Sequence, residues 1–296
     1  LLEKIRKRLN EPQIISLCGL RRVGKTTLME KIISDYSKTH GASSTMYFSM
    51  DDFTQIELLD VIDAFKEIHG KEPKFVFLDE VQKLENWAEK VKILYDTKKY
   101  KLFISGSQSL FLRKGSRESL AGRIFEFEIS TLTFGEYLEF SGKKHLALKP
   151  LLYSNELEKE FNDYLLTGGF PEMIGKKDVK LIREYVKNSI VEKIVFSDMP
   201  RLYPIEEPAK VAAILDVLVD NPGMMVELTS LSQKLGLSRQ TLSKYLEYLE
   251  QAHLIVKTYN YSKNRLTSEK KLKKAFPTFL TPALYDSLDS TIIGKI

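Results

Sequence analysis

The stretch GLRRVGKTT, Gly19–Thr27, decides the fold expected for this chain. It fits the pattern G-x-x-x-x-G-K-[ST], with glycines at positions 19 and 24 followed by Lys25 and Thr26. The apolar run before it, residues 14–18, is typical of a buried strand, and residues 28–33 after it have helical spacing. A strand, a glycine loop and a helix in this order predict a phosphate-binding loop.

The residue types of this loop suit a nucleotide. Glycines let the backbone bend tightly and approach a ligand, and the amides of the loop and of the following helix bind phosphate oxygens. We expect Lys25 to reach the β- and γ-phosphates and the Thr26 hydroxyl to ligate Mg²⁺. The nucleotide-binding residues predicted on this basis are Gly19, Leu20, Arg21, Arg22, Val23, Gly24, Lys25, Thr26 and Thr27.

Polar side chains follow two further apolar runs. Asp79 and Glu80 end the run that starts at residue 74, so in a parallel sheet both carboxylates lie at the edge that carries the glycine loop. We expect Asp79 to hold Mg²⁺ through water and Glu80 to polarise the attacking water. Ser107 and Gln108 follow the run at 101–105, and either side chain could hydrogen-bond the γ-phosphate, although an ordinary turn is the alternative.

Arginines come next in the chain, at Arg113, Arg117 and Arg123, in a segment poor in acidic residues. Phosphoryl transfer often uses an arginine from the same or a neighbouring subunit, and Arg123 is the favoured candidate here, although most surface arginines have no such role. The guanine-reading motif N-K-x-D and the motif D-x-x-G do not follow the carboxylate pair. We therefore expect ATP rather than GTP.

The bulk composition is that of a soluble globular protein. The 296 residues suffice for two or three domains, with 43% hydrophobic and 29% charged residues. No apolar run approaches the roughly 18 residues of a membrane span, and the charged N-terminus does not resemble a signal peptide. The single cysteine, Cys18, fits a reducing cytoplasm and is interpreted as a buried small hydrophobe. The four histidines have no metal-ligand spacing, so no zinc site is expected.

Strand and helix patterns alternate from about residue 10 to 130, which predicts an α/β core with a parallel sheet. The strand pattern then stops, and helical patterns follow, with Pro200, Pro204 and Pro208 marking a loop. After that loop, two helices joined by a Gly236-Leu237 turn and two short strands resemble a winged helix. The predicted domains are a P-loop core at 1–133, a helical lid at 134–205 and a winged helix at 206–296.

The positive charge is unevenly placed. Residues 221–276 hold ten Lys and Arg against four Asp and Glu, a net +6, whereas the remainder holds 35 and 36, a net −1. An anionic partner, double-stranded DNA, is therefore expected at this part of the chain. The alternative is a protein-binding winged helix with a solvated basic face. The expected DNA contacts are Arg239, Gln240, Ser243 and Lys244 on the recognition helix and Lys263, Arg265, Lys270 and Lys271 on the wing.

Five segments, GLRRVGKTTL, FVFLDEVQ, ISGSQSLFL, LAGRIFEFEISTLTFGEYLEF and LLTGGFPEM, in that order, resemble archaeal and bacterial ATPases of the AAA+-related class. These proteins join a P-loop ATPase core to a helical lid and a winged helix. The resemblance implies an added strand between the P-loop and Asp79-Glu80, placed at 45–50, with Glu80 as catalytic base. It also implies that Ser107 stands near the sensor position, where Asn is usual.

Many similar proteins continue into a nuclease-like domain. Because this sequence ends at Ile296, nuclease activity is not expected. Together these patterns predict a cytoplasmic, Mg²⁺-dependent ATPase that acts as a nucleotide-controlled switch and binds DNA, with no membrane partner. The alternative is a nucleotide-gated module that binds a protein instead, and a homo-oligomer is compatible with either function. A steep salt dependence of DNA binding would separate the two.

Overall fold

A computed structural model of the chain describes residues 1–107, 119–259 and 272–285. The chain forms two compact units. The first unit comprises residues 1–20 and 24–130, and the second comprises residues 21–23 together with 131–296. The finer domain limits expected from the sequence, 1–133, 134–205 and 206–296, stay predictions.

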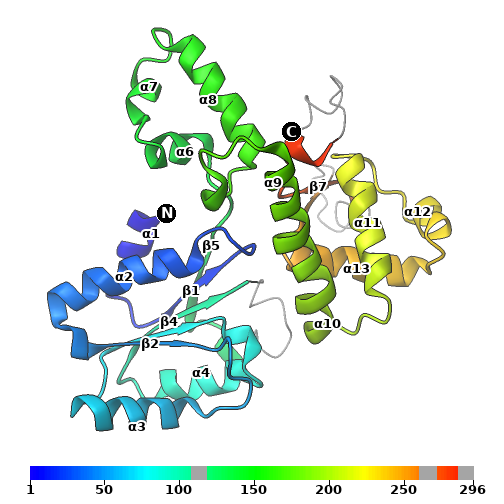
Figure 1. Ribbon diagram of the computed structural model, residues 1–296. Helices are drawn as coiled ribbons and strands as arrows, with labels where there is room; N and C mark the ends of the chain where they lie inside the picture. The colour runs from blue at the N-terminus through cyan, green and yellow to red at the C-terminus, as the bar shows by residue number, and fades with distance from the viewer. Residues whose placement is uncertain (108–118, 260–271, 286–296) are drawn as a thin grey trace. The chain divides into compact units, whose positions relative to one another are not determined.

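The first unit is built on a five-stranded parallel sheet with the strand order β2-β3-β4-β1-β5 (Figure 1). Every residue of β1 is buried, as expected for a strand covered on both faces. The α/β fold class predicted from the alternating pattern is therefore confirmed. The strands are β1 (Ile14–Cys18), β2 (Thr45–Ser49), β3 (Phe75–Asp79), β4 (Lys101–Gly106) and β5 (Ile124–Glu128).

Helices cover both faces of this sheet (Figure 1). On one face, Tyr36 of α2 contacts Phe77 and Phe103, whose stacked rings have centroids 4.3 Å apart. On the other face, the alternate residues of β3 and β4 pack with buried side chains of α3 and α4, among them Ile62 and Val91. Successive side chains of a strand point to opposite faces, so each strand serves both cores. The helices are α1 (Leu2–Arg6), α2 (Lys25–His40), α3 (Leu58–His69) and α4 (Trp87–Asp96).

The position of one strand differs from the expectation. The segment predicted at 45–50 as the added strand is β2, which forms the edge of the sheet beyond β3. The strand that separates the P-loop strand from the Asp79 strand is β4. Ladder pairs Cys18↔Gly106 and Leu78↔Ile104 bring the carboxyl ends of β1, β3 and β4 to one edge. The glycine loop, Asp79 and Ser107 therefore lie at the same edge of the sheet, with β4 between the strands of the first two and Ser107 directly after β4.

The first part of the second unit is helical. Thr133 begins α6 with a capping box, in which its side chain accepts from the Glu136 amide and the Glu136 carboxylate accepts from the Thr133 amide. The expected loop at Pro200 is wrong, because Pro200 lies in the first turn of α10, where a missing N–H is tolerated. The helices are α6 (Phe134–Phe140), α7 (Lys144–Leu148), α8 (Ser154–Thr167), α9 (Val179–Glu184), a π-helical continuation (Tyr185–Asp198) and α10 (Met199–Leu202).

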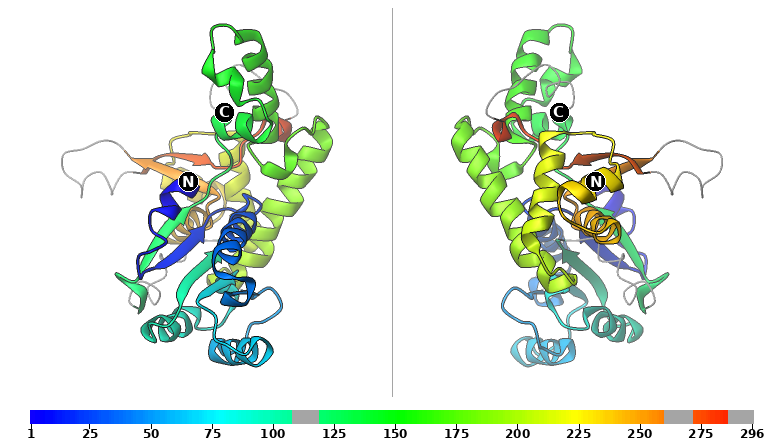
Figure 2. Two further views of the ribbon diagram at one scale, coloured as in Figure 1. Left: turned by 90° about the vertical axis from the view of Figure 1, so that its left-hand side faces the viewer. Right: turned by 90° about the vertical axis from the view of Figure 1, so that its right-hand side faces the viewer.

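The second part of this unit joins three helices to an antiparallel pair of strands (Figure 2). Ser238 begins the third helix by accepting from the Thr241 amide at 3.0 Å. The second strand starts at Leu272, four residues before the predicted start at 276. No helix in the described residues is long and apolar enough to cross a bilayer. The elements are α11 (Pro208–Asp220), α12 (Leu228–Lys234), α13 (Arg239–Gln251), β6 (Ile255–Tyr259) and β7 (Leu272–Pro277).

Candidate functional site

The glycine loop connects β1 to α2 through backbone conformations that favour glycine. Gly19 has a φ of 146°, and a Cβ there would lie 2.0 Å from the carbonyl oxygen of Ile129. Gly24 has a φ of 94° and directly precedes α2, and a Cβ there would meet no heavy atom within 4 Å. Gly19 therefore packs against the chain after β5, whereas Gly24 faces open space at the N-terminus of a 16-residue helix. Such a terminus attracts anions.

Lys25 is the first residue of α2, and its side chain reaches back to the loop. Its side chain is buried, and Nζ donates to the carbonyl oxygens of Gly19 at 3.1 Å and Leu20 at 2.9 Å. A buried ammonium is stable only where acceptors surround it, and here carbonyls of the loop supply them. This arrangement places a cation beside the helix N-terminus, where it could meet phosphate oxygens.

Asp79, the last residue of β3, is buried and accepts four hydrogen bonds. Its Oδ2 accepts from the hydroxyls of Thr26 at 2.8 Å and Tyr47 at 3.0 Å. Its Oδ1 accepts from the Ser105 hydroxyl and from the Glu80 amide, the latter at 3.0 Å. These donors compensate the burial of the carboxylate and fix its orientation.

Thr26 and Asp79 present oxygens that suit Mg²⁺. A hard cation prefers oxygen ligands, and Mg²⁺ is commonly bound by one or two carboxylates together with substrate phosphates and water. The 2.8 Å separation of Thr26 Oγ1 and Asp79 Oδ2 fits that pattern. Among the described residues no group of three or more His, Cys, Asp and Glu could hold a metal by itself.

Glu80 and Ser107 are brought together by Gln82. Glu80 adopts a left-handed conformation with a φ of 54°, and the turn Val81–Lys83 follows it. From that turn, Gln82 Nε2 donates to Glu80 Oε2 at 2.5 Å and to Ser107 Oγ at 3.0 Å. The two residues predicted to act on water and on the γ-phosphate thus share one amide group, at the edge of the sheet that carries the glycine loop.

The loop arginines Arg21 and Arg22 lie with the second unit rather than the first. Arg21 pairs with Asp198 at 2.9 Å, and both side chains are largely buried. Arg22 binds both carboxylate oxygens of Glu172 at 3.0 Å. From the sequence, these arginines are expected to reach either the nucleotide or a domain partner. The individual carboxylates could not be named, because 177 and 150 residues separate the members of the two pairs.

Arg123 does not lie near the glycine loop of its own chain. It directly precedes β5, and the register Ile14↔Ile124 aligns it with the amino end of β1, whereas the glycine loop follows the carboxyl end. Five residues of strand span about 16 Å. Its guanidinium instead contacts Asp96 at 3.4 Å. This position does not favour an action of Arg123 on a nucleotide bound to the same chain, and its role as a catalytic arginine, for the same or a neighbouring subunit, stays a prediction. Gln108, Arg113 and Arg117 lie outside the described residues.

Tyr47, Ser105 and Gln82 also belong to this site, although the sequence did not predict a role for them. Tyr47 lies on the edge strand β2, and burial and the Asp79 charge raise the pKa of its hydroxyl, so it stays a donor at neutral pH. Ser105 is the fully buried hydroxyl of β4. Polar residues near the carboxyl ends of predicted strands were the available signal, but only the strand order shows which of them meet.

Cys18 ends β1 and is fully buried. Burial raises the pKa of its thiol, and the Glu126 charge acts in the same direction. The reactive thiolate is therefore suppressed, in agreement with a buried structural residue.

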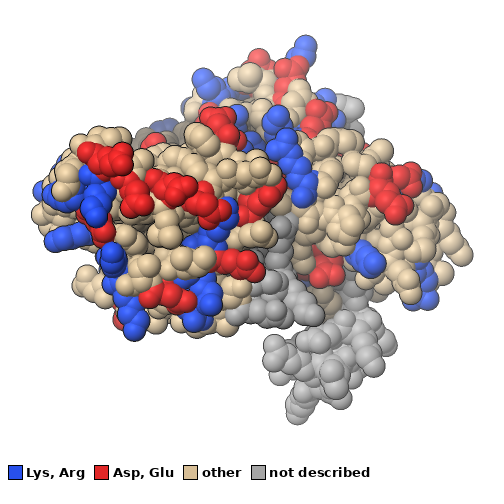
Figure 3. Space-filling view, turned by 90° about the horizontal axis from the view of Figure 1, so that it is seen from below, with Lys and Arg blue, Asp and Glu red and all other residues tan. Residues whose placement is uncertain are grey.

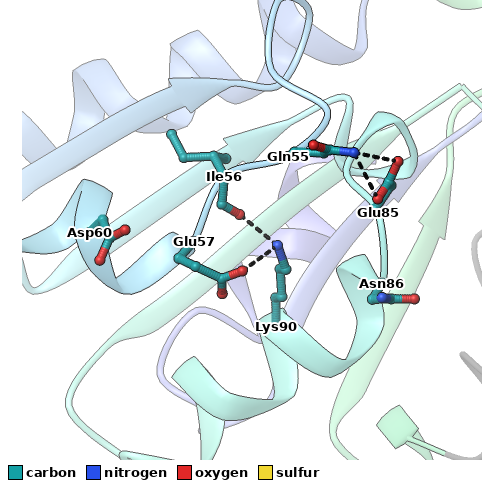
Figure 4. A pocket seen from close by; sticks show the side chains of 7 residues that line it. All are labelled: Gln55, Ile56, Glu57, Asp60, Glu85, Asn86 and Lys90. Carbon is teal, nitrogen blue, oxygen red and sulfur yellow. Dashed lines mark hydrogen bonds and ion pairs between the residues drawn. The ribbon is translucent and has the colours of Figure 1, made fainter.

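A separate polar pocket lies between the start of α3 and the start of α4 (Figure 4). Lys90 donates there to the Ile56 carbonyl at 2.7 Å and pairs with Glu57 at 2.8 Å. Gln55 donates to Glu85 at 3.3 Å. These contacts hold the segment between β2 and α3 against α4. We therefore interpret the pocket as a structural feature of the first unit.

The helix predicted to read DNA presents the expected residues. Leu242, Tyr245, Leu246 and Leu249 of α13 are buried, whereas Arg239, Gln240, Ser243 and Lys244 are exposed. Another of the basic residues, Lys257, pairs with Glu250 at 2.6 Å. Lys263, Arg265, Lys270 and Lys271 lie outside the described residues.

The first unit has mixed charge where α3 and α4 face the viewer in Figure 3. Lys and Arg side chains alternate there with Asp and Glu. Ion pairs such as Lys92–Asp96 account for part of this pattern. The described residues of that face thus form no patch of a single sign.

Comparisons with known protein families support the interpretation of the first unit as an ATPase domain. Residues 11–138 match a protein-family model described as an AAA domain, and residues 158–281 match one described as a domain of unknown function, DUF8612. The first match spans the five-stranded sheet and the glycine loop. It supports a nucleotide-binding P-loop ATPase domain in this part of the chain.

Two proteins of one archaeon are similar to most of this chain. The chain is 28% identical over 304 residues to the uncharacterized protein MJ1637 of Methanocaldococcus jannaschii and 29% identical over 263 residues to MJ1544 of the same organism. The alignments cover 93% and 86% of this chain but 62% and 58% of those proteins, so the chain spans about three fifths of their length. Among solved structures it is similar to Cdc6p from Pyrobaculum aerophilum, with a TM-score of 0.41 and 14% identity over 99% of this chain and 92% of that one.

Proposed function

We propose that this chain binds ATP and Mg²⁺, hydrolyses ATP, and uses the nucleotide state to control the binding of double-stranded DNA. The observation that carries the proposal is the convergence of Lys25, Thr26, Asp79, Glu80 and Ser107 at one edge of the sheet. These residue types at this edge match the parts that phosphoryl transfer to water requires.

Each side chain has a role that follows from its chemistry. The amides at the start of α2 and the ammonium of Lys25 would bind the β- and γ-phosphates. Thr26 and Asp79 would hold Mg²⁺, which neutralises charge on the phosphates when bound. The Glu80 carboxylate would accept a proton from the attacking water, and the Ser107 hydroxyl would donate to a γ-phosphate oxygen. Positioning and charge stabilisation supply most of the catalysis in this class of reaction.

The contacts of Arg21 and Arg22 support the proposal that bound nucleotide controls the binding of DNA. Arg21 and Arg22 of the glycine loop hold Asp198 and Glu172. Phosphates that enter the loop would compete for these guanidinium groups, so nucleotide could alter the contacts of residues 21–23. The exposed basic residues of α13 support DNA as the partner.

The test of the nucleotide site is the variant Lys25→Ala. Loss of the ammonium should weaken ATP binding at least about tenfold and abolish turnover, because charge-assisted contacts to phosphate are lost. Fluorescent-nucleotide titration and phosphate release measure the two effects. The matched control is Lys31→Ala on the exposed face of α2, whose side chain pairs with Asp35. Normal binding and turnover by Lys25→Ala would refute the proposal.

The test of the DNA partner is ATP turnover with and without duplex DNA at low and high salt. Stimulation by DNA that is lost as salt rises supports the proposed switch. Turnover that is indifferent to DNA at all salt concentrations favours the protein-binding alternative.

A further inference from the structure

Gln82 holds two candidate catalytic groups with the two hydrogens of one amide. Its Nε2 lies 2.5 Å from Glu80 Oε2 and 3.0 Å from Ser107 Oγ. A primary amide carries two N–H donors, so one hydrogen can serve each acceptor. The opposite orientation of the amide would bring Oε1 against the Glu80 carboxylate. The hydrogen bonds to Glu80 and Ser107 therefore fix the direction of the group.

No described residue donates to the buried Gln82 Oε1. Placing a buried acceptor without a donor is unfavourable, and an amide normally turns to satisfy both ends. Here the two contacts on the nitrogen determine the orientation, although the oxygen receives no hydrogen bond from residues 1–107, 119–259 or 272–285. The amide group is therefore oriented for its contacts to Glu80 and Ser107, at the expense of a hydrogen bond to its own oxygen.

Each contact fixes what its partner can do. An N–H donated to Ser107 Oγ occupies an acceptor site of the hydroxyl, so the Ser107 proton points elsewhere and is available to another acceptor. An N–H donated to Glu80 Oε2 leaves Oε1 of that carboxylate as the site for a proton. Ser107 is thereby kept as a donor and Glu80 as an acceptor, which are the roles that a γ-phosphate and an attacking water need.

We propose that Gln82 is a positioning residue for ATP hydrolysis, which sets Glu80 as proton acceptor and Ser107 as hydrogen-bond donor. The inference rests on the proposed function and extends it to a residue outside the P-loop and the Asp79-Glu80 pair. Gln82 itself touches neither the phosphates nor the attacking water in this scheme. It acts through the two side chains that do.

The variant Gln82→Met tests this role because it keeps the length of the side chain and removes both donors. We expect kcat to fall about tenfold to a hundredfold, the range that a small misplacement of catalytic groups produces, with the affinity for ATP unchanged. Gln82→Glu keeps the shape but places a second carboxylate beside Glu80, and it should lower kcat at least as far. In a Ser107→Ala background, Gln82→Met should cost clearly less than in the wild type, because one of its two contacts is already absent.

Gln55→Met is the matched control. Gln55 also donates to a glutamate, Glu85, but both line the pocket between the start of α3 and the start of α4, and no residue of the glycine loop lines that pocket (Figure 4). We expect this variant to keep wild-type kcat. An equal loss in both variants would mean that any glutamine-to-methionine change disturbs the unit, and the inference would be overturned.

A second readout separates this inference from the proposed function. The full chain is titrated with the fluorescent analogue mant-ADP, with and without aluminium fluoride, which mimics the transferring phosphoryl group. Wild type should bind more tightly with aluminium fluoride, and Gln82→Met should lose about tenfold of that gain while mant-ADP alone binds equally. A wild type with no gain and no turnover refutes the proposed hydrolysis. A wild type with both, matched by Gln82→Met, overturns only the role of Gln82.

Discussion

At the scale of single residues, the backbone decides where side chains of the site can act. Gly19 lies against the carbonyl of Ile129, and Gly24 opens the N-terminus of α2. Both have positive φ angles, but only Gly19 is in close contact with other backbone. The two fixed glycines of one motif therefore have different physical tasks, close packing at Gly19 and a free approach at Gly24.

This difference predicts unequal effects of alanine. Gly24→Ala places a side chain on a strained backbone conformation, which should lower the free energy of unfolding by roughly 1–3 kcal/mol. Gly19→Ala carries comparable strain and must also displace the Ile129 carbonyl, so we expect it to be more destabilising. Urea unfolding of both variants measures the difference. Equal destabilisation, or a larger loss in Gly24→Ala, would contradict this assignment.

At the scale of elements, β4 connects the parts of the first unit. Its carboxyl end supplies Ser105 to Asp79, and it lies between β1 and β3. Its amino end supplies Lys101, whose Nζ donates to the carbonyls of Glu11 and Gln13, each at 2.6 Å. The carboxyl end of β4 thus supports the candidate site, and its amino end holds the segment before β1 in place.

Lys101 predicts a pH dependence of stability. Burial lowers the pKa of its ammonium from 10.5 to about 8, so the folded chain releases this proton before the unfolded chain does. Between those pH values the unfolded state binds more protons, and the free energy of unfolding therefore rises with pH. We define the difference as the free energy of unfolding of the wild type minus that of Lys101→Met. We expect this difference to become more positive by on the order of 1–2 kcal/mol from pH 8 to pH 10.

Urea unfolding of both proteins at several pH values checks this expectation. Tyrosines that titrate in the same range are common to both proteins and cancel in the difference. A difference that stays flat, or that falls as the pH rises, would show that Lys101 keeps its ordinary pKa in the folded chain.

At the scale of the whole molecule, the net charge is unevenly distributed along the chain. Residues 221–276 carry a net +6, and the remainder carries −1. The described residues place exposed basic side chains at the start of α13, whereas the α3 and α4 face of the first unit has mixed charge. A polyanion should therefore bind the second unit, and its affinity should fall steeply as salt displaces it.

The double variant Arg239→Ala/Lys244→Ala tests this surface. Removing two phosphate contacts should reduce the slope of log affinity against log salt by about 2, since each contact contributes roughly 0.9. Fluorescence anisotropy with labelled duplex DNA between low and high salt measures the slope. The control Lys176→Ala/Lys180→Ala removes the same charge from exposed positions elsewhere in the second unit. Equal slopes in the two variants would indicate a general charge effect instead of a binding face on α13.

The sequence by itself determined the glycine loop, the alternating strands and helices of the core, the Asp79-Glu80 pair, and the buried and exposed faces of α13. These features follow from local spacing, because phosphate loops, strand alternation and helical periodicity involve residues close together in the chain. Only the tertiary structure decided the order of the strands, the edge on which Arg123 lies, and the meeting of Tyr47, Ser105 and Gln82 with the motif residues. Strand order depends on pairing between distant segments, and local periodicity carries no information about which strand becomes a neighbour.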